Sequence, residues 1–335
     1  CRGRPAGVEA GGGRGLSSPR PPRPEHRIPF RLQPQETDRA PGAAPLVSVV
    51  VATCGRAEML RACLESLLAQ EGPAFEVVCV DDGSRDATPA VLADLARAHG
   101  DRLRAVRTEN RGPGPARNAA VAAARGEWVV VADDDTEAPP GWLAALWAAR
   151  EQTGTDAVAY ALAPRGNEGP AARYLWFRHR FTVGARPRRD YIGPAFLLLR
   201  RADWLRAGGF PEARLGAAED YAFCLALRRA GVSIAFEPSI TVRHHFEADW
   251  DTARRKVRAA GRDGGAVYLA AGRGRAALLL HAAAKLLTAP GWCLWAYPPD
   301  LYPAALRMEA LFFAERVGAC LPWSMRAGSA SQEGK

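Results

Sequence analysis

Trp128-Val129-Val130-Val131-Ala132-Asp133-Asp134-Asp135 joins a short apolar run to three consecutive carboxylates. The run 128–132 has the length and the β-branched content of a buried strand. Three acids at the end of a buried strand repel one another and lose hydration, so they are costly unless a partner neutralises them. Hard divalent cations such as Mg²⁺ and Mn²⁺ are the usual partners, because they take oxygen ligands. The stretch therefore favours a metal site, with a solvated acidic turn as the alternative.

The segments around this stretch alternate between strand-like and helix-like patterns. Strands are expected at 46–52, 75–80, 103–106, 128–132, 195–199 and 233–236. Helices are expected at 56–70, 88–99, 116–125, 142–150, 202–207, 219–230 and 306–317. Strands that alternate with helices at this spacing indicate βαβ units, and hence an α/β fold around a parallel sheet.

Polar side chains follow several of the expected strands. Asp81 and Asp82 come directly after the strand at 75–80, and His244 lies just beyond the last strand at 233–236. In open α/β sheets, ligands bind beyond the carboxyl ends of the strands. The acidic clusters are therefore expected to share one site at this edge of the sheet.

The composition is that of an ordinary globular protein, with 48% hydrophobic and 24% charged residues among 335. The formal net charge is +9, and basic residues gather towards both ends. This balance suits anionic partners such as phosphates or membrane surfaces, whereas no aromatic-basic motif supports nucleic acid as a partner. Seven dispersed cysteines without CxxC spacing indicate reduced, buried thiols of a cytosolic protein.

Residues 1–44 are rich in Pro, Gly and Arg and lack apolar periodicity, so this segment is expected to be disordered. No apolar signal-peptide core is evident near the start of the chain. The run 276–296 comes nearest to a membrane span, but His281, Lys285 and Pro290 interrupt it, so no clear span is expected. From 251 onward the pattern is mostly helical.

Five motifs occur in a fixed order along the chain. They are the first strand 47–53, Val80-Asp81-Asp82-Gly83-Ser84, the segment 110–118 with Arg117, the segment 126–135 with the Asp triplet, and Gly208-Gly209-Phe210 followed by Glu219-Asp220. Together they resemble a family 2 glycosyltransferase with the GT-A fold over about residues 46–250. The resemblance implies a mostly parallel central sheet flanked by helices, with a Rossmann-like nucleotide-binding half. The implied organisation is a disordered segment 1–44, a GT-A domain 45–250 and a helical C-terminal extension 251–335.

The resemblance also implies roles for individual residues. Donor binding is expected from Thr53, Arg56, Asp82, Arg117, Asp133 and Asp134, with Asp82 at the nucleoside base. Metal binding is expected from Asp135, Asp133 and His244. The base that takes the acceptor proton is expected in the pair Glu219-Asp220, of which Asp220 is the better match. Simpler readings remain for four of these residues: a turn cap for Asp82, a surface side chain for Arg117, a helix cap for one acid of the pair, and a structural role for His244.

The activity implied is metal-assisted transfer of one sugar to an acceptor hydroxyl, with inversion. The donor would be a UDP-, GDP- or dTDP-sugar, the metal Mn²⁺ or Mg²⁺, and the acceptor a glycan or a lipid-linked saccharide. The expected location is the cytoplasm or the inner face of the membrane, because Trp and Tyr residues near 292–302 accompany basic residues. The Gln-x-x-Arg-Trp motif of processive synthases is absent, which favours transfer of a single sugar.

Two departures and two alternatives qualify this reading. The first strand commonly ends Pro-Thr-x-Asn in the family, whereas here it ends Ala52-Thr53-Cys54-Gly55, which puts the nucleoside pocket in question. A nucleotidyltransferase-like enzyme would usually carry a longer glycine-rich loop after that strand. A non-catalytic nucleotide-binding protein on the same fold would be favoured by loss of one of the acids, and all are present. No GxGxxG follows the first strand, which argues against a dinucleotide-binding dehydrogenase.

Overall fold

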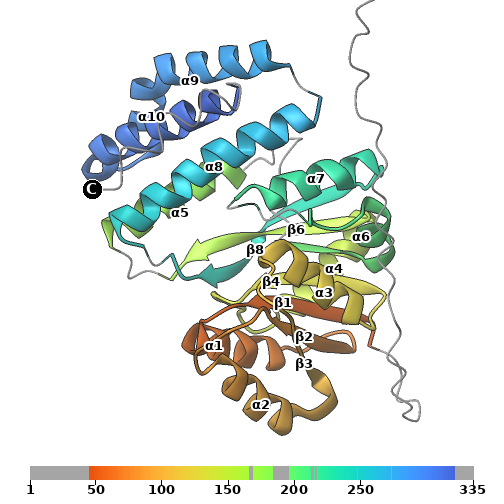
Figure 1. Cartoon of the computed structure of the whole chain (residues 1–335). Coiled ribbons are helices and arrows are strands. Elements are labelled where there is room, and N and C mark those ends of the chain that lie inside the picture. Colours follow the sequence, from red (N-terminus) through yellow and green to blue (C-terminus); the bar gives the residue numbers. More distant parts are fainter. Residues whose placement is uncertain are drawn as a thin grey trace, which may run out of the picture. The chain divides into compact units, whose positions relative to one another are not determined.

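The computed structural model describes residues 45–165, 169–183, 196–212, 215, 217–246, 248–272 and 274–320. The predicted disordered segment 1–44 lies outside these residues. All described residues fall within one contact unit, Ala40–Lys335. They build a mixed sheet whose strands run in the order β3-β2-β1-β4-β7-β6-β8-β5, with helices against both faces (Figure 1).

The first half of the sheet is parallel, as predicted. It contains β1 (Val47–Thr53), β2 (Phe75–Asp81), β3 (Leu103–Arg107) and β4 (Trp128–Asp133). In register, Thr53 of β1 pairs with Asp81 of β2, and Ala52 of β1 pairs with Asp133 of β4. The carboxyl ends of three neighbouring strands therefore lie level with one another, and the polar residues that follow them meet at one edge.

The second half of the sheet is mixed. It contains β5 (Thr136–Glu137), β6 (Ala157–Pro164), β7 (Leu197–Arg200) and β8 (Ile234–His244). The strand β7 runs antiparallel to both β4 and β6, while β6 and β8 are parallel. The short β5 pairs antiparallel with β8, with Thr136 opposite His244, so this pairing carries the end of β8 to the Asp triplet.

The last strand corrects the sequence prediction. The sequence indicated a strand at 233–236 with His244 beyond it, whereas His244 is the last residue of an eleven-residue strand. The pairing of β8 with β6 shifts register between Tyr160 and Ala161, which leaves Pro238, Ser239 and Ile240 out of the ladder. Proline has no N–H to donate to a ladder, so a strand that contains it needs such an irregularity. The polar residues Glu237, Pro238 and Ser239 interrupt the apolar pattern, so the sequence does not indicate that the strand continues beyond 236.

Two apolar cores fill the space between the sheet and its helices. The helices are α1 (Ala57–Leu68), α2 (Thr88–His99) and α4 (Trp142–Thr153) on one side, and α3 (Pro113–Ala123), α6 (Arg201–Ala207) and α7 (Glu219–Arg229) on the other. Successive strand side chains point to opposite faces. Accordingly Val49 and Val51 enter the first core, and Val50 enters the second. The continuous apolar runs of the parallel strands follow from this burial on both faces.

A bundle of helices follows the sheet, and the predicted helical C-terminal region is confirmed. It consists of α8 (Trp250–Ala270), α9 (Arg275–Ala296) and α10 (Tyr302–Gly318), with α5 (Pro170–Val183) packed against α8. Gly261 and Gly265 let α8 and α10 come close together, because a Cβ at Gly261 would lie 2.4 Å from the carbonyl oxygen of Phe312. A buried carboxylate, Glu309, accepts hydrogen bonds from the hydroxyls of Tyr174 and Tyr297. This bond network ties α5 to α10.

The helix α9 does not agree with the expectation that the chain contains no clear membrane span. Within the part of the chain that the structure describes, α9 alone is long and apolar enough to cross a membrane by length and composition. Only 22% of its most apolar 18-residue window is buried. Its interruption by His281, Lys285 and Pro290 does not prevent the helix from forming.

Candidate active site

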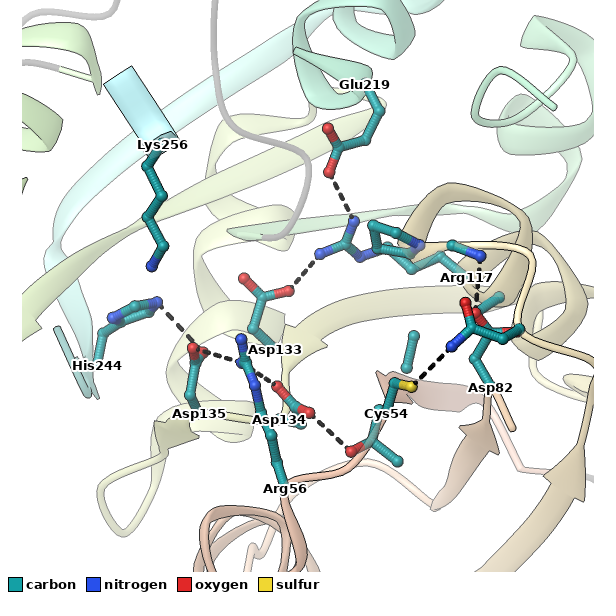
Figure 2. A pocket seen from close by; sticks show the side chains of 16 residues that line it. Cys54, Arg56, Asp82, Arg117, Asp133, Asp134, Asp135, Glu219, His244 and Lys256 are labelled. Atoms are coloured by element: carbon teal, nitrogen blue, oxygen red, sulfur yellow. Dashed lines mark hydrogen bonds and ion pairs between the residues drawn. The ribbon is translucent and has the colours of Figure 1, made fainter. Parts of the chain in front are cut away.

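A cavity of about 420 Å³ opens at the edge where β1, β2 and β4 end (Figure 2). It is lined by Ala52, Thr53, Cys54, Arg56, Asp82, Asn110, Gly112, Pro113, Ala116, Arg117, Asp133, Asp134, Asp135, Glu219, His244 and Lys256. The fold therefore brings together every site residue expected from the sequence except Asp220. Asp220 lies next to Glu219 in the first turn of α7, and its Oδ1 accepts a hydrogen bond from the backbone N–H of Tyr221.

Asp134 is the buried anchor of the Asp triplet. Its Oδ2 accepts a hydrogen bond of 2.7 Å from the hydroxyl of Thr53, and its Oδ1 accepts one of 2.9 Å from Nη1 of Arg56. The same Nη1 donates to Oδ2 of Asp135 at 2.9 Å. Burial raises the pKa of Asp134 to about 6, although Arg56 opposes the shift. This acid ties the triplet to the end of β1, and all three acids of the triplet line the cavity.

Asp133, Asp135 and His244 form the group that could hold a metal ion. One ligand atom from each lies within 4.8 Å of the other two. The Nε2 of His244 lies 3.2 Å from Oδ1 of Asp135, and Nδ1 of His244 is buried without a hydrogen-bond partner in the described part of the chain. Burial lowers the pKa of His244, which favours the neutral imidazole that binds metals. Two carboxylates and an imidazole can bind a divalent cation, so the residues fit the expected metal.

The charge of the cavity supports the same conclusion. Its lining carries five carboxylates but three cationic side chains, Arg56, Arg117 and Lys256, so with neutral His244 the formal charge is −2. A nucleotide-sugar brings a further negative charge on its diphosphate. A divalent cation would remove the mismatch, because it neutralises the lining and binds phosphate oxygens.

Asp82 is fixed by the loop that precedes α3. Its Oδ1 accepts hydrogen bonds from the hydroxyl of Thr108 and from the backbone N–H of Arg111, and its Oδ2 accepts one from the backbone N–H of Gly112. Gly112 has a φ of 101°, a conformation that side chains disfavour. Asp82 thus does hold a turn, as the simpler reading proposed, and it also faces the cavity.

Arg117 is buried in the first turns of α3 and joins two acids from distant parts of the chain. Its Nη2 donates to Oδ1 of Asp133 at 2.6 Å, and its Nη1 donates to Oε1 of Glu219 at 3.4 Å. Burial alone would lower the pKa of Arg117, but these carboxylates raise it. The reading of Arg117 as a plain surface residue is therefore wrong, since 9% of the residue is exposed.

The Gly208-Gly209-Phe210 motif packs against the guanidinium group of Arg117. The Phe210 ring lies 5.2 Å from the guanidinium carbon of Arg117. Asn118 accepts a hydrogen bond from the backbone N–H of Phe210 and donates one to its carbonyl oxygen, each at 2.9 Å. A Cβ at Gly209 would lie 2.5 Å from Oδ1 of Asn118, which explains the need for glycine there.

Three lining residues with polar or ionisable side chains carry no role in the sequence prediction. Lys256 of α8 extends towards His244 and Asp135 (Figure 2). In the sequence Lys256 comes after all the motifs described above, and its neighbours are those of an ordinary surface lysine on an amphipathic helix. Cys54 and Asn110 line the cavity together with Asp82, and Nδ2 of Asn110 donates to Sγ of Cys54 at 3.2 Å. Cys54 stands between Thr53 and Gly55, at the position that the family pattern leaves unspecified.

Replacing Asp134 by Asn is expected to stabilise the protein in the absence of metal. The pKa of Asp134 is about 6 in the fold against an ordinary 3.8, so its contribution to stability is present below pH 4 and lost as the pH rises through about 6. Asn keeps an acceptor for Thr53 without the buried charge, so D134N should gain on the order of 1–3 kcal/mol at pH 7. Urea unfolding of both proteins at pH 7 and pH 4 checks this, and the difference should vanish at pH 4. A loss of stability at pH 7 would mean that the Arg56 ion pair outweighs desolvation.

Comparisons with known proteins agree with this geometry. Residues 48–206 match the family model described as Glycosyl transferase family 2. The succinoglycan biosynthesis protein ExoO of Rhizobium meliloti is 43% identical over 113 residues, which are 33% of this chain and 30% of that protein. An uncharacterised protein of Mycobacterium tuberculosis, MT1568, is 31% identical over 229 residues, which are 62% of this chain and 69% of that protein. The chain spans less than half of the length of several curated relatives that it matches.

One solved structure shows the shared architecture. The mannosyltransferase PcManGT of Pyrobaculum calidifontis, solved in complex with GDP-Man and Mn²⁺, matches with a TM-score of 0.59 and 22% identity. The match covers 84% of this chain and 88% of that chain. At this identity the likeness concerns the fold, and the GT-A fold predicted from the sequence is confirmed.

Proposed function

Because the chain belongs to glycosyl transferase family 2, we propose that it transfers a single sugar from a nucleotide-diphosphate sugar to an acceptor hydroxyl. One observation carries the proposal. A single cavity joins a fixed acid at the nucleoside end, a group able to bind a divalent cation, and a half-buried carboxylate held by an arginine. We assign to them the binding of the nucleoside, the stabilisation of charge on the diphosphate and the removal of the acceptor proton.

Asp133, Asp135 and His244 would hold Mn²⁺ or Mg²⁺. The ion, when bound, would supply positive charge to the diphosphate as the nucleoside diphosphate leaves. Arg56 would keep Asp134 and Asp135 in place, as its hydrogen bonds do now. Asp133 and Asp134 would contact the ribose or the donor sugar, and Thr53 would position Asp134.

Asp82 would select the nucleoside base. A carboxylate has about four acceptor positions, and three hydrogen bonds within the protein already occupy three of them on Asp82. The remaining position on Oδ2 matches the single imide N–H of uracil or thymine. Guanine presents two adjacent N–H donors and would leave one unpaired. The donor is therefore expected to be a UDP- or dTDP-sugar rather than a GDP-sugar.

Glu219 would act as the base. Its carboxylate would take the proton of the acceptor hydroxyl while that oxygen bonds to the anomeric carbon and the bond from that carbon to the diphosphate breaks. The nucleoside diphosphate would leave with the bonding electrons, with inversion at the anomeric carbon. The sequence match favours Asp220, but Glu219 is the acid that faces the cavity. Burial, and then the charge of Asp220, raise the pKa of Glu219, which suits a proton acceptor.

The acceptor is proposed to be a glycan or a lipid-linked saccharide, reached at the cytoplasmic face of a membrane. The aromatic and basic residues around α9 are the observation behind this proposal. The alternative is a protein that binds a nucleotide without catalysis. Loss of one of the acids would have favoured it, but all the expected acids and their cationic partners are present.

The proposed function is tested by thermal unfolding of the 335-residue protein with UDP, dTDP, GDP or CDP, each with and without Mn²⁺. UDP or dTDP with Mn²⁺ should raise the melting temperature by roughly 5 °C or more at about 100 times Kd. D135N should abolish the shift, while D94N, at an exposed acid on α2, should keep it. A well-folded protein that responds to no nucleotide would contradict the proposal.

A further inference from the structure

The outer face of α9 is apolar and exposed. Leu280, Leu287 and Leu294 are exposed by 72%, 84% and 63%, and Trp295 is exposed by 82%. The three leucines are seven residues apart, so they form one stripe along the helix. The opposite stripe, which includes Leu278 and Ala282, is buried. The helix packs chiefly on α10 and is the outermost helix of the C-terminal bundle (Figure 1).

This exposure is unusual for a water-soluble helix. Scattered exposed leucines are ordinary, but a contiguous apolar face marks a surface that binds something. The most apolar window of α9 is 22% buried, so α9 is not the core helix that its composition would suggest. Among the described residues, most of the exposed large hydrophobic side chains belong to this one helix.

The charges around the face point to an anionic surface. The helix α9 contains Arg275 and Lys285 and no acidic residue. The three acids of the described segment 274–320 are each paired with an arginine of α5 or α8: Asp300 with Arg173 at 2.7 Å, Glu309 with Arg178 at 3.0 Å, and Glu315 with Arg258 at 2.6 Å. Negative charge near α9 is thus neutralised within the protein. Basic residues beside an apolar face suit a bilayer interface with anionic headgroups.

We propose that the outer face of α9 lies in the plane of a phospholipid bilayer that contains anionic headgroups. Leu280, Leu287 and Leu294 enter the boundary of the acyl chains, and Trp295 lies at the level of the headgroups. Lys285 lies about 140° around the helix from Leu280, at the edge of the exposed face next to the buried stripe. Its Nζ lies 5.8 Å from the centroid of the Trp292 ring. From this edge the charged end of its long side chain can extend to lipid phosphates. The proposal requires neither donor nor acceptor, so it stands or falls independently of sugar transfer.

Two other occupants of this face are less compatible with the helix. Pairing with a second copy through a leucine zipper needs an apolar side chain at two positions of each heptad. Three residues after Leu280 and Leu287, this second position is occupied by Ala283 and Pro290. These side chains are too small or too rigid to insert between the side chains of a partner helix. A membrane-spanning α9 would have to separate from α10, and its buried residues Cys293 and Ala296 would leave the apolar cluster of the bundle. The surface of α10 exposed in this way belongs to a helix that carries the ion pair of Glu315 with Arg258.

Flotation of the full chain with vesicles tests the proposal. The protein should float with phosphatidylcholine vesicles that contain phosphatidylglycerol, and more weakly with phosphatidylcholine alone. The L280S/L287S double variant should lose roughly tenfold or more of this binding, because two exposed leucines no longer enter the bilayer. K285E should weaken binding to the phosphatidylglycerol vesicles only.

The matched control is L205S, since Leu205 is also exposed, by 46%, but lies on α6. It should bind vesicles as the wild type does, and all variants should keep the wild-type melting temperature. Wild-type binding by L280S/L287S would overturn the proposal. So would resistance of the bound protein to alkaline carbonate, which would indicate a span. A wild-type dimer that L280S/L287S dissociates, without vesicle binding by either, would overturn it in favour of a second copy.

Discussion

The E219Q variant is expected to lose roughly 10²- to 10⁴-fold in the rate of sugar transfer, which is the usual contribution of a positioned general base. Glutamine has nearly the same shape and still accepts a hydrogen bond from Arg117, so donor binding should remain close to that of the wild type. The measurement is the release of nucleoside diphosphate with acceptor present, together with the melting-temperature shift by the same nucleotide and Mn²⁺. A rate loss without a binding loss would place Glu219 at the proton transfer.

The pH dependence of the rate separates Glu219 from its neighbour Asp220. A base must be ionised, so the wild-type rate should fall as the pH drops through the raised pKa of Glu219, above its ordinary value of 4.5. The D220N variant removes a negative charge that raises this pKa, so its inflection should move to lower pH while most of the rate remains. An E219Q variant with near wild-type rate, combined with an inactive D220N, would assign the base to Asp220 instead.

The parts of the site that lie at strand ends could be predicted from the sequence, because local pattern and register are enough to place them. A buried strand that ends in Asp133-Asp134-Asp135 and another that ends in Asp81-Asp82 must meet if the strands are parallel and neighbours. The register of β1 with both strands is the confirmation. The helix expected at 88–99 likewise has the bounds of α2, because Thr88-Pro89 begins it and Gly100 ends it.

The remaining features depend on tertiary contacts that no local pattern records. The contact of Arg117 with Glu219 joins residues that are 102 positions apart. Lys256 of α8 lines the cavity, but nothing in the sequence around it distinguishes it from an ordinary surface lysine. His244 was placed beyond its strand because Pro238 interrupts the apolar alternation, whereas the register shift at Tyr160 and Ala161 allows the strand to continue.

The structure also shows how two arginines pair with four of the five carboxylates of the cavity. Arg56 links Asp134 to Asp135, and Arg117 links Asp133 to Glu219. Each arginine thus bridges two acids that would otherwise repel. When a donor binds, we expect these arginines to pair with its diphosphate as well, because guanidinium groups bind phosphate oxygens in a bidentate manner. The same two residues would therefore serve folding in one state and donor binding in the other.

The stability of the protein should depend strongly on the second of these bridges. The R117A variant is expected to lose about 3–5 kcal/mol of the free energy of unfolding at pH 7, because it leaves Asp133 and Glu219 charged, half-buried and without their common cation. The packing of Phe210 on the guanidinium is lost as well. Urea unfolding measures the change. R111A is the matched control, since Arg111 pairs with Glu212 across two largely exposed side chains and should cost about 1 kcal/mol or less.

The dependence of this loss on pH and on a second substitution identifies its cause. Without Arg117, whose charge lowers the pKa of Glu219, that pKa should rise further. A carboxyl group with a raised pKa gives stability that is present at low pH and lost as the pH rises. The stability deficit of R117A should therefore shrink as the pH falls through the raised pKa of Glu219. R117A/E219Q should recover part of the loss at pH 7, because it removes one unpaired buried charge. If the single variant were as stable as R111A, or if E219Q brought no recovery, the bridge would be a consequence of packing and not a source of stability.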